Sequence, residues 1–270
     1  MERKQGTAQA GGRRGPAGGG GADTIFLFDH NSTTPMLSEV SDYVAEGRVQ
    51  YTYFTSDSPR VKEFTDGLQG RVFQQCFEQA RGYYKWMAFT DLDEFLLVTD
   101  PKYNHSLPAV LRNFESYGAV LAHWQMLGSM GVQQLAEGQD LLPTFTKCMK
   151  PLNAHVKGIA NLEFTSPGVN AHTFTYQEGK TGVRPGDGKT AVRAHRLVRP
   201  LDTPIVLYHF LGSKNNWKDR VERLGAGVSG MTTKIAHQYE VYDRNSTHDC
   251  TAGRDVAMLV PRRPKPTKAA

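Results

Sequence analysis

The stretch Lys85–Leu97, which reads KWMAFTDLDEFLL, decides the fold. An apolar, aromatic run ends in three carboxylates within four positions, and a second apolar run begins directly after them. Side chains alternate along a strand, so Asp91 and Asp93 would share one side while Glu94 faces the other. Because an unpaired buried carboxylate is costly, the pattern predicts a buried strand whose end offers two carboxylates to a hard cation, Mg2+ or Mn2+. The alternative interpretation is an acidic turn on the surface.

Strands and helices alternate ahead of this motif. Thr24–Phe28 has the composition of a buried strand, and Asp29 opens the polar turn that follows it. A short helix is predicted over 37–46, a strand over Val49–Phe54, and a longer helix over 71–84, where aromatic residues recur at helical spacing. This order predicts an α/β fold with a mostly parallel sheet covered by helices. Ligands of such sheets gather beyond the carboxyl ends of the strands, where Asp29 and the acidic motif both fall.

The regular alternation fades after the acidic motif. A helix is predicted over 107–117 and a strand over Ala119–Trp124. Trp124 at a strand end could stack on a sugar face, or it could be a core residue. Residues 132–204 are rich in Gly, Pro, Lys and Asn, with short apolar fragments around Phe145, Ile159 and Phe174. This composition indicates an irregular, loop-rich region of loops and short strands folded over a site.

Order returns near the carboxyl end of the chain. Pro204–Phe210 is predicted to be a strand with His209 near its end, and Ser213–Leu224 an amphipathic helix that begins beside Lys214. A lone histidine in an apolar strand is usually a satisfied core residue. His209 also stands at a strand end near a cation that could meet phosphate, so both interpretations stay open.

Composition limits the possible classes of protein. The chain has 270 residues, 39% of them hydrophobic, and a formal charge of +5 that comes largely from its two ends. Residues 1–22, rich in Gly and Arg, and the basic, Pro-rich residues 241–270 are predicted to be disordered tails around a single domain at 23–240. No nucleic-acid motif and no apolar run long enough to span a membrane occurs, so neither a nucleic-acid partner nor a membrane span is expected in this chain. Three scattered cysteines indicate neither a zinc site nor a full disulfide framework.

Six short motifs follow one another between residues 24 and 225. They are Phe28–Ser32, Lys85–Trp86 with Phe89–Phe95, Trp124 with Leu127–Ser129, Lys147–Cys148, His172–Phe174, and Tyr208–Phe210 with Ser213–Lys214. Each motif is weak alone, but in this order the set resembles glycosyltransferase family 92 and the related family-2-like enzymes. The resemblance implies a GT-A-like (Rossmann-like) fold, a UDP-sugar donor, UDP-galactose in several relatives, a divalent metal and inversion at the anomeric carbon.

The resemblance also implies roles for individual residues. The metal, Mn2+ or Mg2+, would be held by Asp91, Asp93 and His209. The donor would be bound by Asp29, Asp91 and Lys214. The glycan acceptor would be bound by Trp124, Gly128, Ser129, Lys147 and His172. A bound cation and a neighbouring lysine would stabilise the charge that develops on the leaving diphosphate.

No residue stands out as the base that inversion requires. Glu94 is expected to face away from the metal, and the remaining candidates lie in predicted loops: Glu137, Asp140, Glu163 and Asp187. The catalytic residue is therefore unknown at this point.

The chain departs from the family at its amino end. Relatives generally begin with a further strand and helix ahead of the Thr24–Phe28 strand, and a membrane anchor usually precedes them, whereas residues 1–22 occupy that place here. His30 stands where the family tends to have Asn, and Lys147–Pro151 is an imperfect match. The resemblance still leads us to expect the Golgi or secretory lumen, although this chain carries no signal or anchor.

The predicted function is metal-dependent transfer of a hexose, galactose by resemblance, from a UDP-sugar to a glycan hydroxyl. The alternative is a non-catalytic, carbohydrate-binding relic of the same fold, which would leave Asp91 and Asp93 without a purpose. A metal-dependent hydrolase or phosphotransferase is a third hypothesis, but the chain has no P-loop, G-x-S-x-G or H-E-x-x-H pattern.

Overall fold

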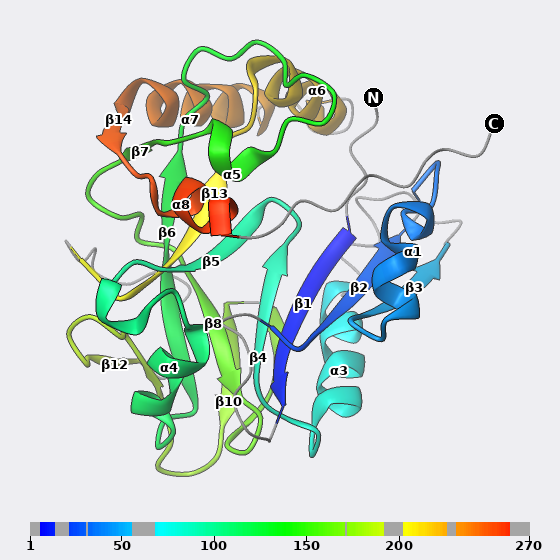
Figure 1. The fold of residues 1–270 in the computed structure, drawn as a ribbon, viewed down its shortest axis with the longest axis vertical. Coiled ribbons are helices and arrows are strands. Elements are labelled where there is room, and N and C mark those ends of the chain that lie inside the picture. The colour runs from blue at the N-terminus through cyan, green and yellow to red at the C-terminus, as the bar shows by residue number, and fades with distance from the viewer. Residues whose placement is uncertain are drawn as a thin grey trace.

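The fold is α/β, with helices packed around one large, curled, mixed sheet (Figure 1). The computed structural model describes residues 6–13, 22–30, 32–55, 68–170, 172–191, 202–225 and 231–259. The strands are β1 (Gly6–Arg13), β2 (Thr24–His30), β3 (Val49–Phe54), β4 (Tyr84–Asp91), β5 (Glu94–Val98), β6 (Ala119–Leu127), β7 (Lys147–Met149), β8 (Val156–Asn161), β9 (Thr165–Asn170), β10 (Thr173–Tyr176), β11 (Gly182–Val183), β12 (Thr190–Ala191), β13 (Ile205–Phe210) and β14 (Ser246–Asp249).

The helices agree well with the sequence pattern where that pattern was clear. The predicted helices over 37–46 and 213–224 are confirmed as α1 and α6, whereas the one predicted over 107–117 divides into a short α-helix and a 3-10 turn. The helices are α1 (Leu37–Ala45), α3 (Leu68–Ala80), α4 (Leu107–Leu111), α5 (Leu141–Thr144), α6 (Lys214–Gly225), α7 (Met231–Asn245) and α8 (Ala252–Leu259), with 3-10 turns η1 (Pro101–Tyr103) and η2 (Arg112–Phe114).

The sheet is mixed rather than mostly parallel, which corrects the prediction. Its main path runs β12-β11-β6-β8-β4-β1-β2-β3, while β13 pairs with β6 and β5, and β7 with β6 and β14. Only the pairs β2–β3, β6–β13 and β6–β11 are parallel among the described strands. The strands β4 and β6 still point the same way, because both are antiparallel to the strand between them, β8. The antiparallel strands β1 and β8 come from segments that were expected to be a tail and a region of loops and short strands.

Strand β1 lies where a disordered tail was expected. Residues Gly6–Arg13 pair antiparallel with β2 on one side and with β4 on the other. Figure 1 shows β1 between these two strands. A strand at this place supplies backbone partners to the facing edges of β2 and β4, which would otherwise be open.

Strand β8 is the central element that the sequence analysis missed. All six of its residues are buried, and it lies between β4 and β6. A Cβ atom on Gly158 would lie 2.1 Å from Cε2 of Phe174, so only glycine lets this ring pack against the strand. Lys157 and Gly158 interrupt the apolar run around Ile159, so the sequence predicted only loops and short strands here and not a strand at the centre of the sheet.

The core lies on both faces of the sheet. On one face, Phe73 and Phe77 of α3 pack on Phe89 of β4, with ring centroids 4.7 and 5.3 Å apart. On the other face, Val110 and Leu111 of α4 join the cluster that contains Trp86 and Ala88 of β4. Because neighbouring residues of a strand point to opposite faces, α3 and α4 cover opposite sides of β4.

Residues 241–259 form regular elements, which corrects that part of the predicted tail over 241–270. They form the end of α7, then β14, which pairs with β7, and then α8. A disulfide joins Cys148 in β7 to Cys250, with their Cα atoms 5.8 Å apart. Helices α6 and α7 lie together over one end of the sheet (Figure 1), where Trp217 stacks on Tyr239. No helix in the described part of the chain is long and apolar enough to cross a membrane.

Candidate functional site

The acidic motif lies at the end of β4, as predicted. Asp91 is the last residue of β4, Leu92 and Asp93 form a turn, and Glu94 begins β5. The Glu94 side chain is fully buried, whereas that of Asp91 is 47% exposed. The turn interrupts the alternation of an extended strand. Glu94 therefore returns toward Asp91 instead of facing away from it, which corrects the prediction.

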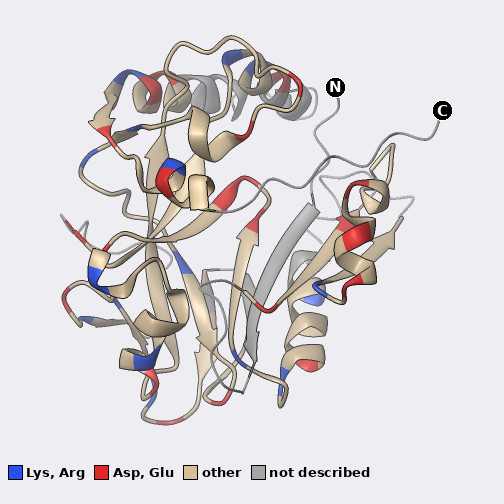
Figure 2. Cartoon of the chain, in the orientation of Figure 1, with Lys and Arg blue, Asp and Glu red and all other residues tan. Residues whose placement is uncertain are grey.

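A buried lysine from β8 joins the two carboxylates. The Nζ atom of Lys157 lies 2.9 Å from Oε2 of Glu94 and 3.1 Å from Oδ2 of Asp91. The backbone N–H of Asp91 donates to the same Oε2 atom, at 2.9 Å. The three residues thus form a closed ring of interactions that fixes both the backbone and the carboxylate of Asp91. Lys157 is the one charged residue of β8. Figure 2 shows that the central strands of the sheet are mostly tan, with red at the end of β4.

Charge and burial set the pKa values of the three groups. Desolvation would raise the pKa of Asp91, but attraction to Lys157 and the hydrogen bond from it outweigh that effect and hold the pKa below its usual value. Burial raises the pKa of Glu94 to about 7. Attraction to Lys157 opposes this rise, and repulsion from Asp91 adds to it. Burial would lower the pKa of Lys157, yet the two carboxylates raise it, so the ammonium stays charged.

His209 and Asp93 lie at the same corner of the sheet. His209 of β13 is the register partner of Glu94 in β5, and the N–H of Phe210 donates to the carbonyl oxygen of Asp93 at 3.4 Å. Attraction to His209 and to His172 further lowers the pKa of Asp91. The structure therefore places the predicted metal ligands at one corner of the sheet, together with one predicted acceptor residue.

The donor set suits Mn2+ or Mg2+ in its chemistry. Carboxylate oxygens are the ligands that Mg2+ prefers, Mn2+ also accepts imidazole nitrogen, and Asp91 keeps a half-exposed side chain. Across the described residues, no three His, Cys, Asp or Glu side chains form a ready-made metal cage. Such ions are commonly bound through one or two carboxylates together with substrate phosphates and water. The residues present fit that mode of binding.

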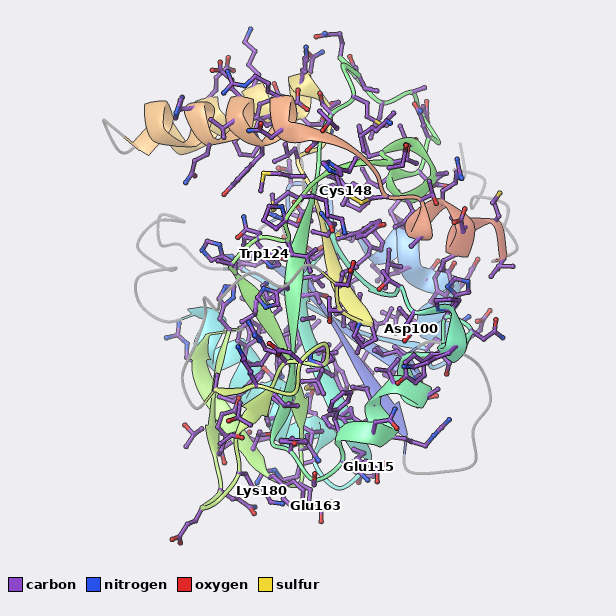
Figure 3. All side chains as sticks on the ribbon, turned by 90° about the vertical axis from the view of Figure 1, so that its left-hand side faces the viewer. Asp100, Glu115, Trp124, Cys148, Glu163 and Lys180 are labelled. Atoms are coloured by element: carbon purple, nitrogen blue, oxygen red, sulfur yellow. A yellow bond between two sulfur atoms is a disulfide. The ribbon has the colours of Figure 1, made fainter. Side chains whose placement is uncertain are left out.

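Trp124 is partly exposed and packed among histidine rings. Its indole ring lies 4.9 Å from His155, which precedes β8, and 4.5 Å from His209 of β13. These residues come from the two sides of β6, because β8 and β13 flank that strand. Figure 3 shows Trp124 midway along the molecule, between the α6–α7 layer and the end where Glu163 and Lys180 lie. This packing favours the interpretation of Trp124 as a core residue over that of a sugar-stacking residue.

His172 belongs to the same corner of the sheet. Its ring centroid is 6.0 Å from that of Trp124, and its Nδ1 atom lies 2.7 Å from the carbonyl oxygen of Val156 in β8. The imidazole is thus anchored to the strand that carries Lys157. Among the predicted acceptor residues, His172 is the one whose charge acts directly on Asp91.

The Gly128–Ser129 loop is enclosed rather than open to an acceptor. Ser129 is fully buried, and its N–H and hydroxyl donate to the carboxylate of Asp243 in α7 at 2.5 and 2.9 Å. A Cβ atom on Gly128 would lie 2.5 Å from Cβ of Ser246. Direct contact with an acceptor does not fit this geometry. The loop instead holds the end of β6 against α7 through the hydrogen bonds to Asp243.

Asp29 is also enclosed. Its carboxylate is fully buried and accepts hydrogen bonds from the N–H of Met36 and the hydroxyl of Tyr51, each at 2.7 Å, and from the Ser32 hydroxyl. The carboxylate therefore orders the loop between β2 and α1. Direct contact with a donor, as predicted, does not fit.

The two lysines predicted for the site lie at the surface. Lys147 in β7 pairs with Asp249 in the neighbouring antiparallel strand β14 at 2.8 Å, and these side chains are 37% and 75% exposed. Lys214 is exposed at the start of α6, where its N–H donates to the carbonyl oxygen of Val132. Lys157, which the sequence analysis missed, is the lysine that contacts the acidic motif. A single charge inside the run Val156–Ala160 was the signal that could have revealed it.

A family comparison agrees with this geometry. The model of glycosyltransferase family 92 matches residues 19–165, which is more than half of the chain. The chain belongs to glycosyltransferase family 92. The matched region includes β4 with its acidic turn, β6 and Lys157, while His172, His209 and Lys214 lie beyond it. No curated protein is significantly similar to this family member.

Proposed function

We propose that this family 92 member transfers a hexose, galactose by resemblance, from a UDP-sugar to a glycan hydroxyl with inversion, in a metal-dependent reaction on a GT-A-like scaffold. The observation that supports the proposal best is the orientation of Asp91. Its backbone and one carboxylate oxygen are fixed by buried partners, while the side chain stays half exposed at the end of a core strand. A rigid, accessible carboxylate is what a diphosphate-bridging site requires.

In this proposal Asp91, Asp93 and His209 hold Mn2+ or Mg2+ together with the donor diphosphate. When bound, the cation neutralises charge that develops on the leaving diphosphate. The chain's own residues set the place and direction of binding: Lys157 and Glu94 fix Asp91, and β13 brings His209 beside the turn. The exposed Lys214 would meet the phosphates from the start of α6.

The glycan acceptor would approach the corner that His172 occupies. In the proposal His172 contacts the acceptor, while Trp124, Gly128 and Ser129 support the floor of the site from within. Lys147 would make no direct contact with the acceptor, because it pairs with Asp249 across the β7–β14 strand pair.

We further propose the Golgi or secretory lumen as the compartment. The Cys148–Cys250 disulfide supports this, because such bonds persist in oxidising compartments. Asn104 heads an N-x-S sequence on the exposed η1 turn and could accept a glycan there.

Calorimetric titration of UDP with and without Mn2+ tests the proposed donor site. The wild type should bind UDP only with Mn2+, and the double variant Asp91→Asn/Asp93→Asn should lose that binding. Asp42→Asn is the matched control, because Asp42 is an exposed carboxylate on α1. Glycan binding without UDP or Mn2+, in a folded chain that binds no UDP, would favour the carbohydrate-binding relic instead.

A further inference from the structure

Two buried charges of opposite sign lie directly behind the acidic turn. The side chains of Glu94 and Lys157 are 0% and 4% exposed, and their charged atoms are 2.9 Å apart. Removing ions from water is expensive, and a buried ion pair is often no more stabilising than apolar residues of the same volume. Burial alone therefore gives the fold little reason to carry this pair in β8 and β5.

The pair has a third partner that burial does not require. Asp91 is close to half exposed, so water could solvate its carboxylate without any help from a lysine. Even so, Lys157 reaches Oδ2 of Asp91, and Glu94 accepts the Asp91 N–H through the same oxygen that meets Lys157. Both rotatable parts of Asp91, its backbone and its carboxylate, are thus held by the buried pair.

Lys157 is also placed where it can hold a fixed position. It lies in the middle of the sheet, on a strand whose six residues are all buried and which is paired on both sides. A side chain anchored on such a strand transmits little motion to its partner. The corresponding surface pair, Lys85 with Glu115, is 28% and 45% exposed and holds no third group in the ion pairs of the described residues.

We propose that Lys157 is a positioning residue of the donor site, which together with Glu94 aims the Asp91 carboxylate at the cation bound to the donor diphosphate. The inference rests on the proposed function. It assigns the lysine a role in binding without direct contact with the reacting atoms. Loss of partners that orient a metal ligand typically weakens metal binding by roughly 10- to 100-fold.

The opposite hypothesis is that Lys157 competes with the cation for Asp91. A lysine that merely neutralises Asp91 would have to be displaced before metal binds, so its removal would tighten binding. The two hypotheses therefore predict changes of opposite sign in the affinity for Mn2+.

The test uses the double variant Glu94→Gln/Lys157→Met. It removes both buried charges together, so neither is left unpaired and the chain keeps its fold. Lys157→Met alone would leave the Glu94 carboxylate buried without its cation. Lys85→Met is the control for loss of a surface lysine. Free Mn2+ is followed by electron paramagnetic resonance during titration in the presence of UDP, and thermal unfolding is recorded for each variant.

The wild type and Lys85→Met should bind Mn2+ alike, and the folded double variant should bind it roughly 10- to 100-fold more weakly. Equal or tighter binding by the folded double variant would overturn the positioning role of Lys157. Failure of the wild type to bind Mn2+ with UDP would instead overturn the proposed function on which the role rests.

Discussion

Two regions of this molecule each hold a lysine against an aspartate, and they differ in almost every other respect. At the β4–β8 corner, Lys157 is buried and bridges Asp91 and the buried Glu94. At the β7–β14 strand pair, the charged atoms of Lys147 and Asp249 lie at a similar distance but remain in solvent. The comparison teaches that the short contact itself carries little information. Burial and the number of partners distinguish a lysine that shapes a site from one that covers an edge.

The largest expected effect is that of Lys157→Met on stability. This change leaves Glu94 buried without its cation, which costs about 3–5 kcal/mol of the free energy of unfolding. Chemical denaturation followed by circular dichroism measures the cost. An unfolding free energy within error of the wild type would contradict the assignment of Lys157 to a buried ion pair.

The next effect concerns the second region, where a disulfide joins Cys148 of β7 to Cys250, which follows β14. The double variant Cys148→Ala/Cys250→Ala opens a covalent loop with a sequence separation of 102 residues. Loss of the cross-link should lower the free energy of unfolding by about 2–4 kcal/mol. Comparison of the oxidised wild type with this variant, under non-reducing conditions, checks the prediction. Equal midpoints of unfolding would show that the β7–β14 strand pair and α8 are held by packing alone.

A smaller effect, confined to the first region, is the pH dependence of stability. Burial raises the pKa of Glu94 from an ordinary value of 4.5 to about 7, so the folded state holds a proton that the unfolded state has already released between these values. The contribution of Glu94 to stability therefore falls as pH rises through this window, by at most about 3 kcal/mol in the metal-free protein. Denaturation of the wild type and of Glu94→Gln from pH 4.5 to 7.5 measures it. Parallel curves for the two proteins would contradict the raised pKa.

The smallest effect is expected for Lys147→Met. Its ion pair is exposed, and such pairs contribute little because water and salt screen them. The midpoint of unfolding should stay within error of the wild type. A loss as large as that of Lys157→Met would erase the distinction between the two regions.

The same contrast explains what the sequence could predict. The strand before Asp91 and the helix 37–46 were found because apolar periodicity is a local signal. The central place of β8 and the role of Lys157 were missed together, because a lysine and a glycine inside a short apolar run are typical of loops and of short strands outside the core. The carboxyl-terminal tail was predicted from the basic, Pro-rich end of the chain, and this composition concealed the ordered residues 241–259.

The misplaced site residues depended on contacts far away in the sequence. Ser129 is enclosed by Asp243, more than one hundred positions later, and Trp124 by histidines on neighbouring strands. No local pattern distinguishes a serine that binds a ligand from one that binds a helix. The position of Asp91 at a strand end was predicted correctly because the turn that follows it is encoded within four residues.

The central claim is that the β4–β8 corner, and not the β7–β14 strand pair, binds the donor. Titration of UDP in the presence of Mn2+ into Asp91→Asn/Asp93→Asn and into Lys147→Met/Asp249→Asn tests it most directly. The first variant should lose binding, and the second should match the wild type. Binding that survives in the first variant, or is lost only in the second, would contradict the account.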